Sequence, residues 1–525
     1  MSITLLHHAE EKVLASIVSS GLIRSFSAAQ VRSVSFSDRP ARLNSQIYVL
    51  LNPTDTERRL LETLSAQKRK VILFGSLGTR LAADIGIEVA PLTAHSANWA
   101  AVQPSKDSTF DVSQAAIVYS DEHSLTAPVS LRRRPLSRYD FTDEWNTLGF
   151  GRITVKGGLW SLCQQAKATQ AKPIAQVVDR NGEEMSAYAA IAETPDSSLL
   201  WFNRAVGPID SLEWRIIETF CSEHRADSLG CIPYLSEIPV GYEGTVTMRL
   251  DCDQAIATAR PLFERYQDLK VPLSLAIVTG LPPQAEDMAF LREVLACGGA
   301  VVSHSCTHPP NWGEDYSAAK QEAQQSKAWL EGNLPEAGPI HYAVSPFHQN
   351  PAYAVNALTD AGYLGFVGGV IHNDPEYLFG RSGQVPLCDR PLISHSQQCM
   401  LHGDCYHRYG DSVAPYQESF AHHLKSGCLF GYLDHPFSSG YQYGWHSESE
   451  RISAHAELIT SIQSHENIWF PNLVQCLEFA RKRSLLQVEL HDHQIKAWRS
   501  PSAIPLSSTP ALQVSLRGEN TPISD

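Results

Sequence analysis

The stretch Met248-Arg249-Leu250-Asp251-Cys252-Asp253 decides the fold, because it has the pattern of a buried strand that ends in two carboxylates. Residues two apart on a strand point to the same face, so Asp251 and Asp253 should converge at the carboxyl end of the strand. Their mutual repulsion has to be relieved by a cation or by a shared proton. In the alternative interpretation, one carboxylate caps the following helix and the other is solvated.

Strand and helix patterns alternate around this stretch, from residue 245 to about residue 485. Short apolar runs predict strands and amphipathic runs predict helices, which together indicate an α/β fold, either a β/α barrel or a doubly wound sheet. The expected strands are 246–250, 273–278, 300–303, 341–344, 364–367 and 429–433. The expected helices are 254–269, 285–296, 317–330, 351–361, 416–425, 448–464 and 472–483.

Three further regions flank this domain. Residues 1–40 are expected to be a helical lead-in, and residues 486–525 a strand-containing or partly disordered tail. Residues 41–235 show the strand-helix-strand pattern of a second α/β domain, which loosely resembles a class I glutamine-amidotransferase (flavodoxin-like) module. Its nucleophile candidate, Cys163, has bulky neighbours where a nucleophile elbow needs small ones. We therefore interpret Cys163 as a core thiol and this domain as non-catalytic.

Composition narrows the class of function. The 525 residues exceed the usual size of one domain, and their formal net charge of −14 disfavours general nucleic-acid binding. The 11 cysteines include no Cys-x-x-Cys pair, which is typical of a reducing compartment. The sequence shows neither a secretory signal nor a run of about 18 apolar residues, so we expect a cytoplasmic protein without a transmembrane segment. Nothing in the sequence indicates a protein partner.

A second group of chemically active residues follows the third expected strand, in Ser303-His304-Ser305-Cys306-Thr307-His308. Two imidazoles four residues apart face one side where the chain turns into a helix or a tight loop. Together with one carboxylate they suit zinc or another borderline divalent metal, and they leave a position open for a water whose pKa the metal lowers. About one such histidine pair is expected by chance, so its place after an apolar strand is the stronger signal.

A third candidate, His435, follows the sixth expected strand in Leu433-Asp434-His435-Pro436. An imidazole at that edge of the sheet could supply a proton to a leaving group. A histidine that only packs in the core is the alternative interpretation.

The order of Asp-x-Asp, His-x-x-x-His and a late Leu-x-His, each at a strand end, resembles the polysaccharide deacetylase (NodB-homology) family of carbohydrate esterases. The resemblance covers about residues 245–485 and implies a distorted (β/α) barrel and a carbohydrate substrate. It implies that Asp251 is the catalytic base and His435 the general acid. It also implies a divalent metal, with Zn²⁺ as the first candidate, on the ligands Asp253, His304 and His308.

The chain departs from this family at the third motif, Arg-x-Pro-x-Gly, whose arginine orients the base. Here the stretch is Val344-Ser345-Pro346-Phe347-His348, so Val344 stands in the place of the arginine. Arg249 and Arg390 are the candidates for the missing cation, and Asp374 is a candidate partner of the late histidine.

Two hypotheses follow. The first is a metal-dependent hydrolase that removes an N-acyl group, in the first instance acetyl, from an amino sugar in a glycan or glycan precursor. In it, the metal and a backbone N–H near Phe347 stabilise the oxyanion. The second is a non-catalytic, decayed deacetylase barrel that binds carbohydrate or a protein partner, which the missing arginine favours. Retention of every proposed catalytic and ligand residue type at strand ends favours the enzyme.

Overall fold

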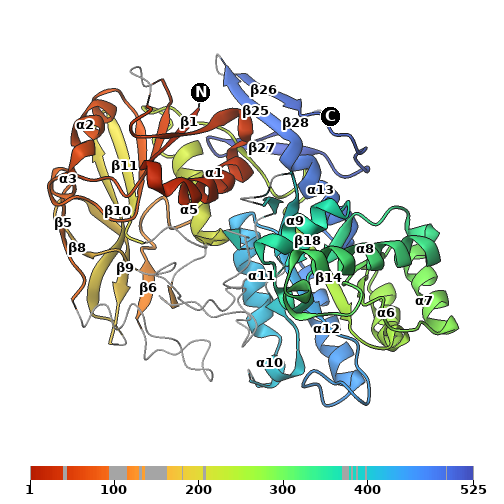
Figure 1. The fold of residues 1–525 in the computed structure, drawn as a ribbon. Coiled ribbons are helices and arrows are strands. Elements are labelled where there is room, and N and C mark those ends of the chain that lie inside the picture. Colours follow the sequence, from red (N-terminus) through yellow and green to blue (C-terminus); the bar gives the residue numbers. More distant parts are fainter. Residues whose placement is uncertain are drawn as a thin grey trace.

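The computed structural model describes residues 2–39, 44–93, 115–128, 133–135, 162–179, 181–204, 209–368, 378–379, 382–385, 388, 390–396, 399–408, 410–491 and 494–523. Two α/β units lie next to each other, one built from the red-to-yellow part of the chain and one from the green-to-blue part (Figure 1). Across the described ranges, no helix combines the length and the apolar character needed to cross a membrane.

The first unit contains a nine-stranded sheet in the order β2-β1-β3-β4-β11-β10-β9-β6-β7. From β2 to β11 the strands pair in parallel, and the flavodoxin-like character expected of this unit stays a prediction. The remaining four strands extend the sheet with antiparallel pairing. The strands are β1 (Ile3–His7), β2 (Val31–Ser35), β3 (Ile47–Leu51), β4 (Lys70–Phe74), β6 (Ala116–Tyr119), β7 (Arg133–Pro135), β9 (Lys172–Val178), β10 (Glu184–Thr194) and β11 (Ser197–Phe202).

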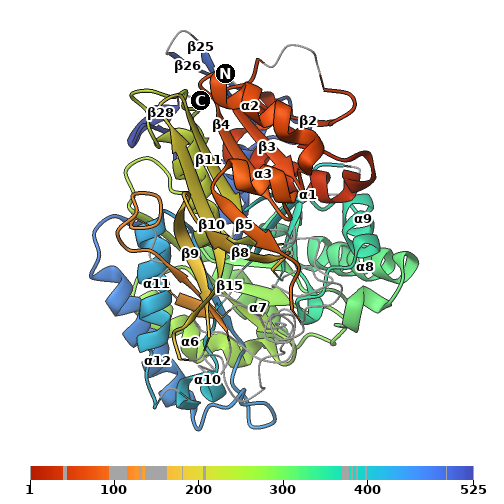
Figure 2. The same cartoon turned by 90° about the vertical axis from the view of Figure 1, so that its left-hand side faces the viewer.

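Helices cover both faces of this sheet, because its buried strands are apolar on both sides. Val49 belongs to the core shared with α1 (Lys12–Phe26) and α5 (Ser211–Ser222). Its neighbour Leu50 points the other way, into the core shared with α2 (Arg58–Ala66) and α3 (Thr79–Asp84). Figure 2 shows the α2–α3 side of the sheet.

The expectation of a helical lead-in over residues 1–40 was wrong. Of this region only α1 is a long helix, whereas Ile3–His7 and Val31–Ser35 are strands of the first sheet. β1 pairs with both β2 and β3, so the first unit begins at the start of the chain. A five-residue apolar run such as β1 cannot be told from a helical segment by its periodicity, which explains the error.

The second unit contains a ten-stranded sheet in the order β20-β21-β18-β17-β16-β15-β14-β23-β22, with β24 paired to β14. All of its pairings are parallel except that of β20 with β21. The strands are β14 (Gly244–Cys252), β15 (Ser274–Ile277), β16 (Ala300–Ser303), β17 (Tyr342–Val344), β18 (Gly365–Gly368), β20 (Gly383–Gln384), β21 (Ile393–Ser396), β22 (Cys399–Met400), β23 (Phe430–Asp434) and β24 (Ile468–Trp469).

The strands and helices expected between residues 245 and 485 are confirmed to within a few residues, although the first expected helix begins as a 3-10 turn. Sequence analysis did not predict β20, β21, β22, β24 or α10, because elements this short carry little periodicity. The helices are α6 (Arg260–Asp268), α7 (Ala285–Ala296), α8 (Tyr316–Asn333), α9 (Ala352–Asp360), α10 (Gly403–Arg408), α11 (Ala414–Ser426), α12 (Glu448–Gln463) and α13 (Leu473–Leu485).

The two ends of the second sheet approach each other. β21 ends at Ser396 and β22 begins at Cys399, yet these strands stand near opposite ends of the strand order. Three Cα–Cα steps span at most about 11 Å, so the sheet must curl round on itself. Within the described ranges no ladder joins β22 to β20 or β21. The structure therefore shows a strongly curved parallel sheet, and closure of the expected barrel stays a prediction.

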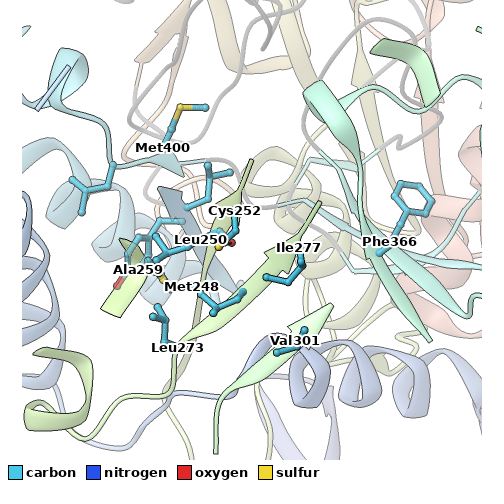
Figure 3. Close-up of a cluster of buried hydrophobic side chains, with 14 of the residues drawn as sticks. Met248, Leu250, Cys252, Ala259, Leu273, Ile277, Val301, Phe366 and Met400 are labelled. Carbon is cyan, nitrogen blue, oxygen red and sulfur yellow. Dashed lines mark hydrogen bonds between the residues drawn. The ribbon is translucent and has the colours of Figure 1, made fainter. Parts of the chain in front are cut away.

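The strand β14 separates an apolar core from the candidate site. Met248, Leu250 and Cys252 pack on the apolar side, in the same cluster as Ala259, which precedes α6 (Figure 3). Arg249 and Asp251 alternate with them and therefore point to the opposite side. On that side, a smaller apolar cluster between β15–β18 and α13 fills part of the interior.

The C-terminal region joins the two units. β25 (Leu486–His491) and β26 (Gln494–Arg499) form one hairpin, and β27 (Leu512–Leu516) and β28 (Glu519–Ile523) form another. β27 also pairs with β13 (Tyr234–Leu235), which lies in the chain between the two sheets. The strands expected in this tail are thus present.

Candidate active site

Asp251 lies buried at the end of β14 and is paired with an arginine of its own strand. Arg249 donates hydrogen bonds from Nε to Oδ1 at 2.7 Å and from Nη2 to Oδ2 at 3.1 Å. Burial raises the pKa of Asp251, but the charges of Arg249 and His304 and the hydrogen bond from Arg249 outweigh it. The pKa of this carboxyl is therefore well below its usual value, and the group is ionised at neutral pH.

Of the two candidates for the missing cation, the structure places Arg249 beside Asp251. Arg390 is instead exposed and forms an ion pair with Asp360 at the end of α9. The proposed partner of the late histidine, Asp374, lies outside the described residues.

Asp253, His304 and His308 meet at the carboxyl ends of β14 and β16. His304 Nε2 lies 3.3 Å from Asp253 Oδ1, and His308 Nε2 lies 3.6 Å from the same oxygen. This oxygen is buried, and no described donor gives it a hydrogen bond. Nitrogen and oxygen ligands about 2.0–2.1 Å from a tetrahedral zinc lie about 3.3 Å apart, so the three side chains fit such an ion.

A tight turn after β16 presents both imidazoles on one side. Ser305 and His308 have left-handed backbones, with φ of 66° and 55°. The His308 N–H donates to Ser305 Oγ at 2.9 Å, which holds the turn. His304 Nδ1 donates to the carbonyl of Val344 at 3.0 Å, so its Nε2 carries the free lone pair toward Asp253. Val344 thus orients the His304 ring through its backbone carbonyl.

Asp253, His304 and His308 form the candidate ligand set, and their surroundings shift the pKa values of the two histidines. Burial, and then the charge of His304, lower the pKa of His308, which favours the neutral imidazole that metal binding needs. Burial also acts to lower the pKa of His304, but Asp251 and Asp253 raise it by more. A proton and a metal ion therefore compete for His304.

His435 follows β23 and approaches the other oxygen of Asp253, with Nε2 3.7 Å from Oδ2. Its Nδ1 lies 2.8 Å from His402 Nε2, within hydrogen-bond distance. The ring stacks on Tyr443 at a centroid distance of 3.7 Å, and the Tyr443 hydroxyl donates to Asp253 Oδ2 at 3.1 Å. Burial first, and then the charge of His402, lower the pKa of His435 well below its usual value.

Sequence analysis missed His402 and Tyr443. Both lie in segments without a preceding long strand, so a search of strand ends could not find them. A compositional signal was present, since seven of the 21 histidines fall between residues 395 and 446. Asp434 Oδ1 lies 3.7 Å from His402 Nε2, so an acidic residue does stand behind the two imidazoles.

Phe347 lies at the edge of the ligand set. Its ring is 45% exposed and its centroid is 4.6 Å from that of His308. Its backbone is left-handed, with φ of 51°, a conformation that is rare for bulky residues and that concentrates at functional sites. The structure thus brings all of the predicted site residues together, while their individual roles stay predictions.

Cys163 belongs to the first unit and takes no part in this cluster. Burial raises the pKa of its thiol to about 11. The reactive thiolate is therefore disfavoured, although the side chain is only partly buried and the expected core position is not confirmed.

Neither the family models nor the curated proteins contain a match to this chain. Three solved structures are similar to this chain. The first is Agd3, which is described as a novel carbohydrate deacetylase. The other two are a family 4 carbohydrate esterase from Streptomyces lividans and a family 4 acetyl xylan esterase from Clostridium thermocellum. Agd3 shares 12% identity over 98% of this chain and 91% of its own, with a TM-score of 0.40. The Streptomyces enzyme shares 11% identity over 44% of this chain and 92% of its own, with a TM-score of 0.28. The Clostridium enzyme shares 12% identity over 44% of this chain and 89% of its own, with a TM-score of 0.29.

All three structures are carbohydrate deacetylases or esterases, the class that the order of sequence motifs also resembles.

Proposed function

We propose that this protein is a metal-dependent hydrolase that removes an N-acyl group, in the first instance acetyl, from an amino sugar in a glycan or glycan precursor. One observation carries the proposal: the two oxygens of Asp253 connect a ligand set to a candidate acid. Oδ1 faces His304 and His308, and Oδ2 faces His435. The arginine-paired Asp251 lies within 3.9 Å of His304 Nε2.

The ligand set fits a divalent metal, and Zn²⁺ is the cofactor we propose. Two features support it: Asp253 Oδ1 is buried and accepts no hydrogen bond from a described residue, and a backbone carbonyl orients His304. Two imidazoles and one carboxylate are donors that suit zinc. A metal bound there supplies a water of lowered pKa and polarises the acyl carbonyl.

Asp251 accepts the proton of the attacking water in this proposal. It is ionised at neutral pH, and Arg249 fixes the direction of both of its oxygens. A bidentate guanidinium-carboxylate pair restricts orientation more than a single hydrogen bond does. Positioning of this kind lowers the activation barrier, because the acceptor is already aligned.

His435 donates a proton to the departing amine in this proposal. Because burial and the charge of His402 lower its pKa, it has to take up that proton during turnover, from the attacking water by way of Asp251. Its Nδ1 contacts His402, which leaves Nε2 directed toward Asp253 and the ligand set. Tyr443 holds the ring from one face by stacking. The backbone N–H of Phe347 is the proposed oxyanion donor, because this left-handed residue lies against His308.

Exposed aromatic rings support a carbohydrate substrate. Phe347 is 45% exposed beside His308, and Tyr441 is 40% exposed beside Tyr443. Aromatic rings that flank a few convergent polar groups are typical of small-molecule sites, and sugars present apolar C–H faces to them.

The non-catalytic alternative depended on Val344 in place of the motif arginine. Arg249 provides a cation to Asp251 from a different position, which supports a catalytic site over a decayed one. To test this, zinc-loaded protein is incubated with N-acetylhexosamine oligosaccharides and nucleotide sugars, and released amine is measured. We expect release that stops on chelation and is restored by metal. Stoichiometric metal without any amine release would favour the binding-only alternative.

A further inference from the structure

We infer a second metal site, separate from the catalytic cluster, formed by His407, His446 and Glu450. One ligand atom from each of these side chains lies within 4.8 Å of the others. His407 belongs to α10, whereas Glu450 belongs to the first turn of α12 and His446 lies two residues before that helix. The site would therefore join two segments that are far apart in the sequence.

His407 has the hydrogen-bond pattern of a metal ligand. Its Nδ1 lies 2.6 Å from Asp411 Oδ1, and because a carboxylate only accepts, this nitrogen carries the proton. Nε2 is buried, has no hydrogen-bond partner among the described residues and lies 3.5 Å from Glu450 Oε2. Metal-binding histidines characteristically donate their other ring N–H to a carboxylate, as His407 does here.

His446 completes the set from the solvent side. Its ring stacks on that of His407 at a centroid distance of 3.9 Å, and its Nδ1 lies 3.6 Å from Glu450 Oε1. His446 is 76% exposed, so an ion can reach the site directly.

Two imidazoles and one carboxylate favour Zn²⁺ or a similar borderline divalent ion, with water in the remaining position. Such an ion would act structurally, because it links α10 to the chain that carries Tyr443. These segments already touch, since the Gly403 N–H donates to the Tyr443 carbonyl at 3.0 Å. A Cβ at Gly403 would lie 2.1 Å from backbone atoms of Gly444 and Trp445. The ion would thereby help to hold Tyr443 against His435.

The test counts the ions bound by the full-length chain. Protein stripped with a chelator is titrated with Zn²⁺ by calorimetry, and bound metal is measured after gel filtration. We expect two ions in the wild type, one in His446→Ala, one in Glu450→Gln, one in His304→Ala, and none in the double variant His446→Ala/His304→Ala. His446 is exposed, so its removal should not alter the melting temperature of the metal-free protein.

A matched control and a graded variant sharpen this test. His422 also faces a glutamate one helical turn away, with Nε2 3.5 Å from Glu418 Oε1, so His422→Ala should keep both ions. Asp411→Asn should weaken Zn²⁺ affinity at this site by about 10–100-fold, the usual effect of losing an outer hydrogen-bond partner. Two ions in His446→Ala and in Glu450→Gln, or no ion in His304→Ala, would overturn the inference. Because His304→Ala isolates the second site, failure of the proposed hydrolase would not affect the result.

Discussion

Arg249 binds both carboxylate oxygens of Asp251 from a position only two residues earlier on the same strand, at 2.7 and 3.1 Å. Neither side chain is more than 2% exposed. A buried pair of this kind contributes little net stability over an apolar pair, because both charges lose their hydration. Its main effect is directional, since it fixes the orientation of the proposed base.

Removal of one partner should be more harmful than removal of both. Arg249→Met leaves a buried, unpaired carboxylate, and we expect a loss of about 3–5 kcal/mol in the free energy of unfolding by urea. The double variant Arg249→Met/Asp251→Leu should recover most of this loss. If the single losses simply add in the double variant, the two side chains are not energetically coupled.

A milder change separates charge from geometry. Arg249→Lys keeps the positive charge but cannot form the bidentate pair. We expect metal content and fold to be retained, and turnover to fall about 10²-fold as the base loses its alignment. Unchanged turnover would mean that the charge alone is sufficient.

Asp251→Asn tests the base itself. Asparagine keeps the size of the side chain but cannot accept the proton, so turnover should fall about 10²–10⁴-fold while the metal at Asp253, His304 and His308 is retained. Metal analysis and amine release on the same sample check both points. Activity close to that of the wild type would assign the base to another residue.

The ligand assignment predicts a specific pattern of metal loss. His304→Ala and His308→Ala should each remove the catalytic ion but leave an ion at His407, His446 and Glu450. Metal affinity at the catalytic site should also fall below about pH 6, because the imidazoles must be neutral to bind. Asp251 and Asp253 raise the pKa of His304, which makes the proton a stronger competitor there. Full metal content in both variants would contradict the ligand set.

The sequence allowed the proximity of Asp253, His304 and His308 to be predicted because the carboxyl ends of parallel strands meet at one edge of a sheet, whereas their role as metal ligands follows from the motif resemblance and stays a prediction. Asp253 and His304 follow β14 and β16 directly, so strand prediction alone brought them together. The choice between Arg249 and Arg390 could not be made in this way, because it depends on tertiary contacts. His402 and Tyr443 escaped prediction for the same reason, since their segments are placed by packing and not by periodicity.

Acid should destabilise the fold through buried histidines, of which His395 is the clearest case. It is fully buried in β21, neither ring nitrogen has a described hydrogen-bond partner, and burial lowers its pKa to about 3. Between about pH 6.5 and pH 3, His395 binds a proton in the unfolded chain but stays neutral in the folded chain. The free energy of unfolding therefore decreases as the pH falls through this range. The slope for one such group is about 1.4 kcal/mol per pH unit.

When the pH falls from 7 to 5, the free energy of unfolding of His395→Leu should therefore decrease by about 2 kcal/mol less than that of the wild type. Urea unfolding at both pH values measures this difference. His422 is partly exposed, so His422→Leu serves as the control, and its decrease in the free energy of unfolding should match that of the wild type. Equal losses in all three proteins would show that His395 is protonated in the folded state.

The role of His435 can be separated from that of its partner by the choice of leaving group. His435→Ala should keep the metal and lower turnover of an N-acetyl amide by about 10²–10⁴-fold. The defect should shrink on an activated aryl ester, whose leaving group needs no proton. His402→Ala should show the same selectivity with a smaller defect, because His402 contacts only Nδ1 of His435 and acts through it. His402→Asn, which keeps a hydrogen-bonding group near that nitrogen, should recover part of the amide activity. A defect in His435→Ala that is equal on amide and ester would mean that this ring positions the substrate or packs against Tyr443, and that the leaving amine obtains its proton elsewhere.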